Sequence, residues 1–146
     1  MLRTTQFRRA SGFTLVEIMI VVAIIALLAA IAVPNFLRAR KRSQATMTLE
    51  ILRQIDDAKD LYAIEFNKVG DSSAGGGVVP SCADLLPYAK PNSLMANQLA
   101  ANHITDVFGR DIAINAIDLP PQITHATYDN FAEVVPTDFW SPYGSY

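Results

Sequence analysis

Cysteine and histidine are nearly absent from this chain of 146 residues. The single cysteine, Cys82, excludes an intrachain disulfide, and a small buried thiol is its expected role. The two histidines, His103 and His125, lie in separate segments and lack the Cys-x-x-Cys or His-x-x-x-His spacing of a zinc site. These shortages argue against a disulfide-built fold and against a zinc enzyme.

Charge and phosphate-binding motifs are also scarce. Only 18% of the residues are charged, and the formal net charge is −2. The glycine run at 75–77 is not followed by Lys-Ser or Lys-Thr, and no strand pattern precedes it, which excludes a phosphate-binding loop. We therefore expect neither an enzyme nor a nucleic-acid-binding protein.

A long apolar run dominates what is present. Ile18 to Val33 contains no polar side chain, and the longer segment from Phe13 to Val33 includes only Thr14 and Glu17 as exceptions. As a helix, this segment of about 21 residues rises about 32 Å, close to the roughly 30 Å hydrocarbon thickness of a bilayer. The segment 13–33 is therefore predicted to cross a membrane.

Glu17 is the unexpected residue in this segment. An ionisable side chain inside a bilayer is costly and indicates a function by default. Near a helix start, however, a carboxylate also interacts favourably with the positive end of the helix dipole. The position of Glu17 alone leaves both interpretations open.

The residues around Glu17 decide between them. Gly12-Phe13-Thr14-Leu15-Val16-Glu17, preceded by Arg8 and Arg9 and followed by the apolar run, Pro34 and Phe36, resembles the amino-terminal signature of type IV prepilins and of type II secretion pseudopilins. The resemblance covers the segment from Gly12 to Phe36 and implies a pilin-like subunit. It implies that a prepilin peptidase removes the basic leader 1–12 after Gly12 and methylates the new amino terminus at Phe13.

The resemblance also suggests a role for Glu17. Cleavage would create a cationic amine on Phe13, one helical turn from Glu17, and the resemblance implies that Glu17 pairs with this amine on a neighbouring subunit. A buried carboxylate is tolerated when it is paired. We expect Glu17 to select and align the next subunit during assembly.

Two alternatives explain the same apolar run without processing at Gly12. An ordinary secretory signal could be cleaved after the small-x-small sequence Ala30-Ile31-Ala32, but the apolar part of such a signal is normally shorter than this run. An unprocessed signal anchor would explain the length of the run, but not the Gly-Phe-Thr-Leu-Val-Glu sequence before it. Neither alternative gives Glu17 a role.

Basic residues flank the apolar run on both sides, so charge alone does not fix the orientation. The resemblance implies a cytoplasmic amino terminus and a periplasmic head on a single-pass protein of the bacterial inner membrane. Loss of the leader removes three of 12 basic residues and leaves nine against 14 acidic ones, a balance of −5. The cluster 38–42 is expected to contact either lipid headgroups or acidic side chains of adjacent subunits such as Glu50, Asp56, Asp57 or Asp60.

The helix is predicted to continue beyond the membrane. Pro34 would remove one helical hydrogen bond, which predicts a kink or local break there. The segment 34–69 has no further proline and no glycine, and its apolar residues recur every three to four positions, typical of an amphipathic helix. That apolar face comprises Leu37, Met47, Ile51, Ile55, Ala58, Tyr62 and Phe66.

The segment 70–146 is predicted to form a small globular head, which makes the expected fold class α+β and type IV pilin-like. Ser81 with Asp84 predicts a capped short helix, and Thr124 a second helix that carries Tyr128, Phe131, Val134 and Val135 and ends at Pro136. Ile104–Phe108 and Asp111–Ile117 are predicted to pair as a short antiparallel hairpin.

We expect the head to bind no metal, apart from one candidate calcium site. Major pseudopilins, which the chain resembles, hold calcium with carboxylates, and Asp106 and Asp111 are the first candidates, with Asp118 and Asp129 as further oxygen ligands. Their spacing matches no known calcium loop, so solvated turn residues are the competing interpretation.

Together these observations predict a structural subunit that polymerises into a pseudopilus for type II secretion. The resemblance implies as partners a prepilin peptidase and methyltransferase, other copies and other pseudopilins, an inner-membrane platform protein and an assembly ATPase. A type IV pilus subunit and a monomeric anchored periplasmic binding module are the alternatives.

Overall fold

The computed structural model describes residues 12–70 and 77–144. The predicted leader lies outside the described residues except for Gly12, as does most of the glycine-rich loop. The chain divides into two compact units, Met1–Leu37 and Arg38–Tyr146, and each is described by itself.

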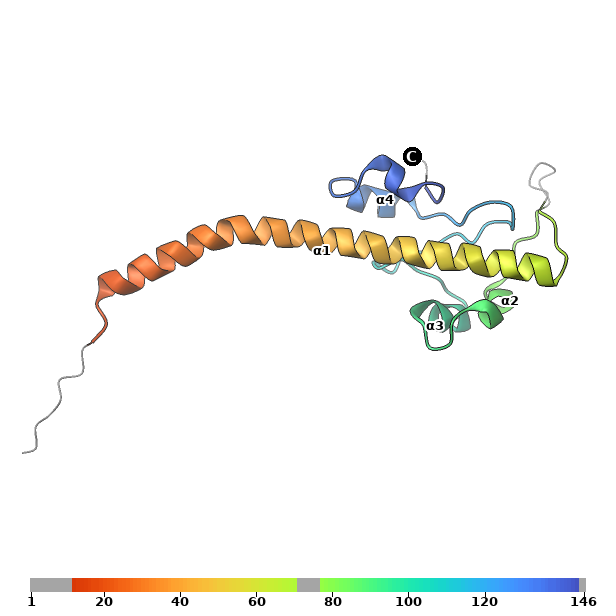
Figure 1. The fold of residues 1–146 in the computed structure, drawn as a ribbon, viewed down its shortest axis with the longest axis horizontal. Coiled ribbons are helices and arrows are strands. Elements are labelled where there is room, and N and C mark those ends of the chain that lie inside the picture. The colour runs from red at the N-terminus through yellow and green to blue at the C-terminus, as the bar shows by residue number, and fades with distance from the viewer. Residues whose placement is uncertain (1–11, 71–76, 145–146) are drawn as a thin grey trace, which may run out of the picture. The chain divides into compact units, whose positions relative to one another are not determined.

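A single helix, α1 (Leu15–Glu65), accounts for most of the first unit and continues into the second (Figure 1). In the first unit its side chains are exposed throughout, except for the half-buried Ala29. The helix ends where Asn67 adopts a positive φ of 47°, and the Lys68 amide donates to the Ala63 carbonyl at 2.9 Å. A left-handed residue with this bond is a common way to close a helix. The long predicted helix is therefore present, and it ends at Glu65 instead of Val69.

Pro34 lies inside α1, and the helix is continuous through it. The structure therefore shows no break at this proline. The predicted kink stays a prediction, because the two units on either side of this region are not placed relative to one another.

The second unit packs its core around the later turns of α1. Ile51, Ile55 and Ala58 of the predicted apolar face are buried, whereas Met47 and Phe66 are 51% and 53% exposed. The remaining buried apolar positions of the helix are Ala45, Leu49 and Leu52. The buried face is therefore wider than the predicted one, since residues 45, 49 and 52 are buried together with 51, 55 and 58.

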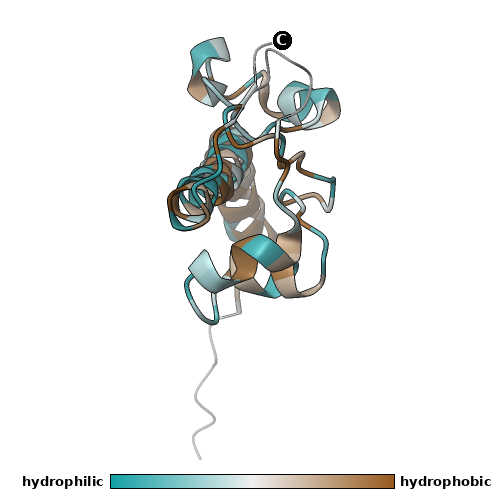
Figure 2. Cartoon of the chain, turned by 90° about the vertical axis from the view of Figure 1, so that its right-hand side faces the viewer, coloured by the Kyte–Doolittle hydropathy of each residue, from teal (hydrophilic) through white to brown (hydrophobic). Residues whose placement is uncertain are grey.

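Short helices cover this part of α1 on two sides. Figure 1 places α2 (Cys82–Leu85) and α3 (Leu94–Ala100) on one side of α1 and α4 (His125–Phe131) on the other, and Figure 2 gives the same arrangement from the end. Two short 3-10 helices, η2 (Leu86–Tyr88) and η3 (Thr137–Trp140), complete the described secondary structure.

The predicted caps are present at both helix starts. Ser81 and Asp84 form a reciprocal capping box on α2, and the Thr124 side chain accepts from the Thr127 amide at the start of α4. The helix α4 ends at Phe131, so Val134 and Val135 lie in the turns that follow it. The predicted end at Pro136 was therefore too late.

The predicted short antiparallel sheet is not confirmed, because the described residues contain no strand. Two isolated antiparallel bridges take its place, Thr105 with Asp111 and Ala113 with Gln122. Asn115 has a positive φ of 57°, which interrupts the extended conformation that a longer strand needs. The two predicted hairpin segments do meet, but over one bridge only.

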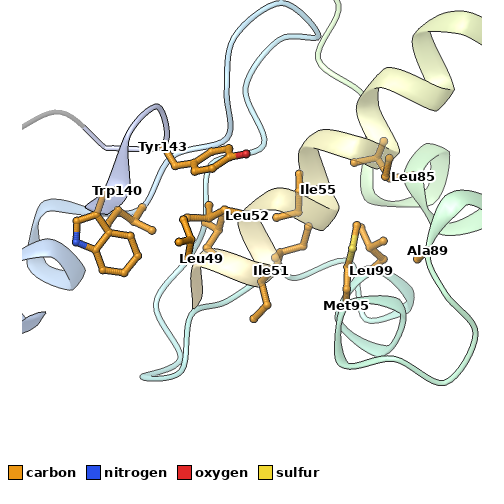
Figure 3. Packing of buried hydrophobic residues seen from close by; sticks show 14 of the residues in the cluster. Leu49, Ile51, Leu52, Ile55, Leu85, Ala89, Met95, Leu99, Trp140 and Tyr143 are labelled. Carbon is orange, nitrogen blue, oxygen red and sulfur yellow. The ribbon is translucent and has the colours of Figure 1, made fainter. Parts of the chain in front are cut away.

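The apolar core joins all these elements. Figure 3 shows Ile51 and Ile55 of α1 in one cluster with Leu85, Met95 and Leu99 from the short helices, while Trp140 and Tyr143 lie near Leu49 and Leu52. Trp140 is fully buried, and its ring lies 5.6 Å from that of Phe131. The C-terminal segment is thus part of the core of the second unit.

Candidate functional site at the start of helix α1

The first turn of α1 contains a reciprocal hydrogen-bonded cap. The amide and hydroxyl of Thr14 donate to Oε2 of Glu17 at 2.7 and 2.8 Å, and the Glu17 amide lies 3.2 Å from the Thr14 hydroxyl oxygen. This is the geometry of a capping box, in which the two side chains satisfy the backbone amides that a helix start leaves unpaired. Sequence reasoning missed Thr14, although the spacing Thr-x-x-Glu is the known signal for this motif.

The cap holds Glu17 in a defined position, but it does not neutralise its charge. Within residues 12–70 and 77–144, no basic side chain forms an ion pair with Glu17. Both bonds from Thr14 go to the same oxygen, Oε2. A carboxylate offers about four acceptor positions. The arrangement can therefore accept a cation from outside the chain without breaking the cap.

Gly12 and Phe13 precede this cap in an accessible segment. A side-chain carbon at Gly12 would meet nothing within 4 Å, and Phe13 is 83% exposed. The peptide bond between these two residues is therefore not shielded by described parts of the chain. Such exposure is what a processing enzyme requires of its cleavage site.

The apolar turns that follow the cap are long enough to cross a membrane. Among the described residues, α1 is the one helix with the length and composition of a membrane span, and its most apolar window is not buried by the rest of the chain. From Leu15 to Val33 the large apolar side chains are 49% to 75% exposed. A lipid bilayer or another protein must cover this surface, because apolar patches of this size are not stable in water.

The calcium candidates have other partners. Asp106 is buried, and its carboxylate accepts from the amides of Phe108 and Arg110 at 2.8 and 2.9 Å and from the Thr127 hydroxyl at 2.5 Å. Asp111 is exposed and lies 2.6 Å from Nε2 of His103. Asp106 therefore holds a turn and ties it to α4.

The other two candidate ligands do not complete a metal site. Asp129 lies 2.9 Å from Nδ1 of His125, within the same helix, and Asp118 lies near the buried Lys59. In the described part of the chain, no three His, Cys, Asp or Glu side chains come together as a metal ion would need. Cys82 is a buried free thiol, as expected.

Lys59 is a buried charged residue of α1. Its Nζ donates to the Leu119 carbonyl and lies 3.8 Å from the carboxylate of Asp56, which in turn accepts from the Tyr143 hydroxyl at 3.4 Å. Burial lowers the pKa of Lys59, and the nearby carboxylates of Asp56, Asp60 and Asp118 oppose this shift. Its spacing after Leu52 and Ile55 was the signal for burial, since the three residues share one helix face.

Known proteins are similar to this chain in the segment that contains the first turns of α1. The family described as the prokaryotic N-terminal methylation motif matches residues 7–33. The chain is 43% identical over 67 residues to the type IV wide pilus major component of Thermus thermophilus, which covers 46% of this chain and 51% of that protein. It is 39% identical over 88 residues to the type IV major pilin of Myxococcus xanthus, covering 60% of this chain and 40% of that protein.

Similarity extends to secretion proteins as well. The chain is 31% identical over 70 residues to the type II secretion system core protein G of Aeromonas hydrophila, covering 48% of this chain and 49% of that protein. The chain thus spans about half the length of the curated relatives it matches. No solved structure matches it significantly.

Proposed function

We propose that this chain, which is a type IV pilin-like protein, is a structural subunit that polymerises through its apolar stem into a pseudopilus for type II protein secretion. The observation that carries the proposal is the exposed apolar segment Phe13–Val33 with a capped, unneutralised Glu17 at its front. Its relatives are named as pilus components and secretion core proteins, which supports a structural role over catalysis.

Processing would precede assembly. A prepilin peptidase would cut between the exposed Gly12 and Phe13, remove the leader 1–12 and methylate the amine of Phe13. The segment 13–33 would then anchor the subunit in the bacterial inner membrane, with the remainder of α1 up to Glu65 as the rest of the long helix and 70–146 as a periplasmic head.

Glu17 would act in the selection of the next subunit. A carboxylate in the apolar interior of a membrane or filament is stable only when a cation pairs with it. The methylated amine of Phe13 on a neighbouring subunit would supply that cation, and the pair would fix the axial position of each new subunit. Other pseudopilins, a platform protein of the inner membrane and an assembly ATPase complete the proposed partners.

Two substitutions separate the charge of Glu17 from its capping role. Glu17→Gln keeps acceptors for the Thr14 bonds but removes the charge, whereas Thr14→Val removes the hydroxyl of the cap and keeps the charge. We expect both variants to be processed to Phe13, as judged by intact mass. Glu17→Gln should reduce the amount of filament that sediments from lysed cells by at least about tenfold, while Thr14→Val should assemble.

Normal assembly of Glu17→Gln would contradict the proposed role of the charge. A wild-type chain that starts at Met1 would identify an unprocessed anchor, and one that starts at Val33 an ordinary secreted protein. Either start would exclude the prepilin pathway.

A type IV pilus subunit is the second candidate, and the pilus components among the relatives favour it. The single cysteine of this sequence favours the pseudopilus, since many pilins close their heads with a disulfide. Deletion of the gene distinguishes them: loss of exoprotein secretion supports the pseudopilus, and loss of surface filaments supports the pilus. A monomeric binding module would give no polymer in either assay.

A further inference from the structure

A cluster of basic side chains follows the apolar stem along α1. The cluster 38–42 contains three arginines and Lys41, and the sequence has no acidic residue between Glu17 and Glu50. All three arginines are exposed, and no ion pair joins any of them to another described part of the chain. The positive charge of the arginines is therefore not neutralised by the part of the chain that the structure describes.

Lys41 differs from the arginines, because the second unit supplies its partner. Its Nζ lies 3.5 Å from Oε2 of Glu133, in the turn after α4, and its side chain is 45% exposed. Arg38 and Arg42 are one turn apart and share a side of α1, whereas Arg40 is rotated from each of them by about 200° at about 100° per residue. The three unpaired charges are therefore divided between two opposite sides of the helix.

The distance of these arginines from the apolar segment suits the edge of a membrane. Arg38 and Arg42 follow Val33 by five and nine positions, or about 8 and 14 Å of helix at about 1.5 Å per residue. The headgroup layer adds about 5 to 8 Å to each side of the hydrocarbon core. Arginine side chains are long enough to extend their guanidinium groups back toward such a layer. With 13–33 in the bilayer, the lipid phosphates are therefore within reach of all three arginines.

We propose that Arg38, Arg40 and Arg42 form an arginine collar that binds the phosphate groups of anionic phospholipids on the head side of the membrane. Guanidinium groups bind phosphate through paired, charge-assisted hydrogen bonds. Lipids surround a membrane helix and meet charges on both of its sides, whereas a single neighbouring subunit would cover only one side. The inference rests on the proposed function, because it requires 13–33 in the membrane, and it names the lipid that the unassembled subunit holds.

Lipid selectivity in vesicles tests the arginine collar. The processed chain, with its start at Phe13 checked by intact mass, is reconstituted at a low protein-to-lipid ratio into phosphatidylcholine vesicles. The vesicles contain spin-labelled phosphatidylcholine or spin-labelled phosphatidylglycerol, and the motionally restricted fraction of the label measures how strongly each lipid associates with the protein. We expect phosphatidylglycerol to associate at least about fivefold more strongly than phosphatidylcholine.

Two triple variants separate the arginine collar from the net charge of the chain. The collar variant carries Arg38→Gln, Arg40→Gln and Arg42→Gln. The control variant carries Arg53→Gln, Lys68→Gln and Lys90→Gln. Both remove the same charge from exposed positions, so the core is not disturbed. The collar variant should prefer phosphatidylglycerol by less than about twofold, and the control variant should keep the wild-type preference.

The lipid measurement can overturn the inference and leave the proposed function intact. Equal association of the two lipids with the wild type would do so, as would a preference that the collar variant keeps. A preference that inorganic phosphate abolishes at constant ionic strength would also overturn it, because the ligand would then be free phosphate and not a lipid.

Modification of arginine with phenylglyoxal tests the acidic side chains of an adjacent subunit as the other partner. We expect the arginine collar to be protected in vesicles that contain phosphatidylglycerol. Protection in sheared filaments alone would assign the collar to a neighbouring subunit and overturn the lipid. A chain that does not start at Phe13, or that does not insert into the vesicles, would instead contradict the proposed function itself.

Discussion

At the scale of single residues, the buried carboxylate of Asp106 is expected to be important for the stability of the second unit. Its carboxylate satisfies two backbone amides and the Thr127 hydroxyl, and the side chain is buried. Asp106→Ala leaves three donors without their acceptor, and hydrogen bonds to a charged group contribute about 1.5–3 kcal/mol each. We expect a loss of at least about 3 kcal/mol in the free energy of unfolding, measured by urea denaturation of the full chain in detergent micelles.

Asp111→Ala is the matched control for Asp106→Ala. Asp111 is exposed and contacts only the side chain of His103 among the described interactions, so its loss should cost less than about 1 kcal/mol. A similar cost for the two substitutions would show that the Asp106 bonds are not stabilising. Calcium that stabilised the wild type but not Asp106→Ala would revive the metal site.

Lys59 makes the stability of the second unit depend on pH. Burial lowers the pKa of Lys59 below its usual 10.5, so the unfolded chain binds more protons than the folded chain between the two values. The free energy of unfolding should therefore rise as the pH increases through that window towards 10.5. Burial raises the pKa of Cys82 and Tyr143, and the bond to Glu65 raises that of Tyr88 to about 12, so these groups lower the stability with rising pH once their unfolded forms ionise. The contribution of Lys59 is therefore the difference in slope between the wild type and Lys59→Met.

The substitution Lys59→Met should remove the rise of the free energy of unfolding with pH. The substitution Lys90→Met, at an exposed lysine, should leave the rise unchanged. Denaturant midpoints at several pH values between about 7.5 and 10 provide the comparison. A rise of equal slope in the Lys59→Met variant would assign the effect to other groups.

Single residues also show where sequence reasoning succeeds and fails. Glu17 was selected as a candidate because a carboxylate before an apolar run is unusual, and its role in assembly stays a prediction. The burial of Asp106 and Lys59 was not predicted, because acidic and basic side chains usually lie in solvent. Their partners, Thr127 and Leu119, are 21 and 60 residues away in sequence, and no local pattern shows such contacts.

At the scale of the elements, local signals predicted the helix starts well. The capping box of Ser81 and Asp84 stabilises a helix of only four residues, which has few internal bonds of its own. Ser81→Ala should cost about 1 kcal/mol in the free energy of unfolding, and Ser81→Gly only a few tenths. Urea denaturation of the two variants and the wild type measures both values, and no measurable cost for Ser81→Ala would show that the cap does not contribute.

The ends of elements and the sheet were predicted less well, for a physical reason. The helix α4 stops at Phe131, and Val134 and Val135 pack in or against the core from the turns that follow. No glycine or proline stands at that position to indicate the helix end in the sequence. The hairpin reduces to one bridge because Asn115 takes a left-handed conformation and because Asp106 holds the turn through its side chain. Tertiary packing decides where α4 ends and how far the hairpin extends, whereas the continuous helical pattern of α1 is visible in its own sequence.

At the scale of the whole molecule, stability and assembly are assigned to different parts of the chain. All residues of the buried core lie at or after Ala45, and the large apolar residues of the stem are exposed. The fragment Arg38–Tyr146 should therefore fold without the stem and remain a soluble monomer. Near-UV circular dichroism and sedimentation velocity test this, and an unfolded or aggregated fragment would show that the stem supports the head.

The buried ammonium of Lys59 has a further consequence for chemical labelling. The other lysines of the chain, Lys41, Lys68 and Lys90, are at least partly exposed, whereas Lys59 is fully buried. An amine-reactive reagent should modify those three within its ordinary reaction time and reach Lys59 only when the head opens. The lag between these modifications, measured by mass spectrometry, reports the opening rate of the second unit.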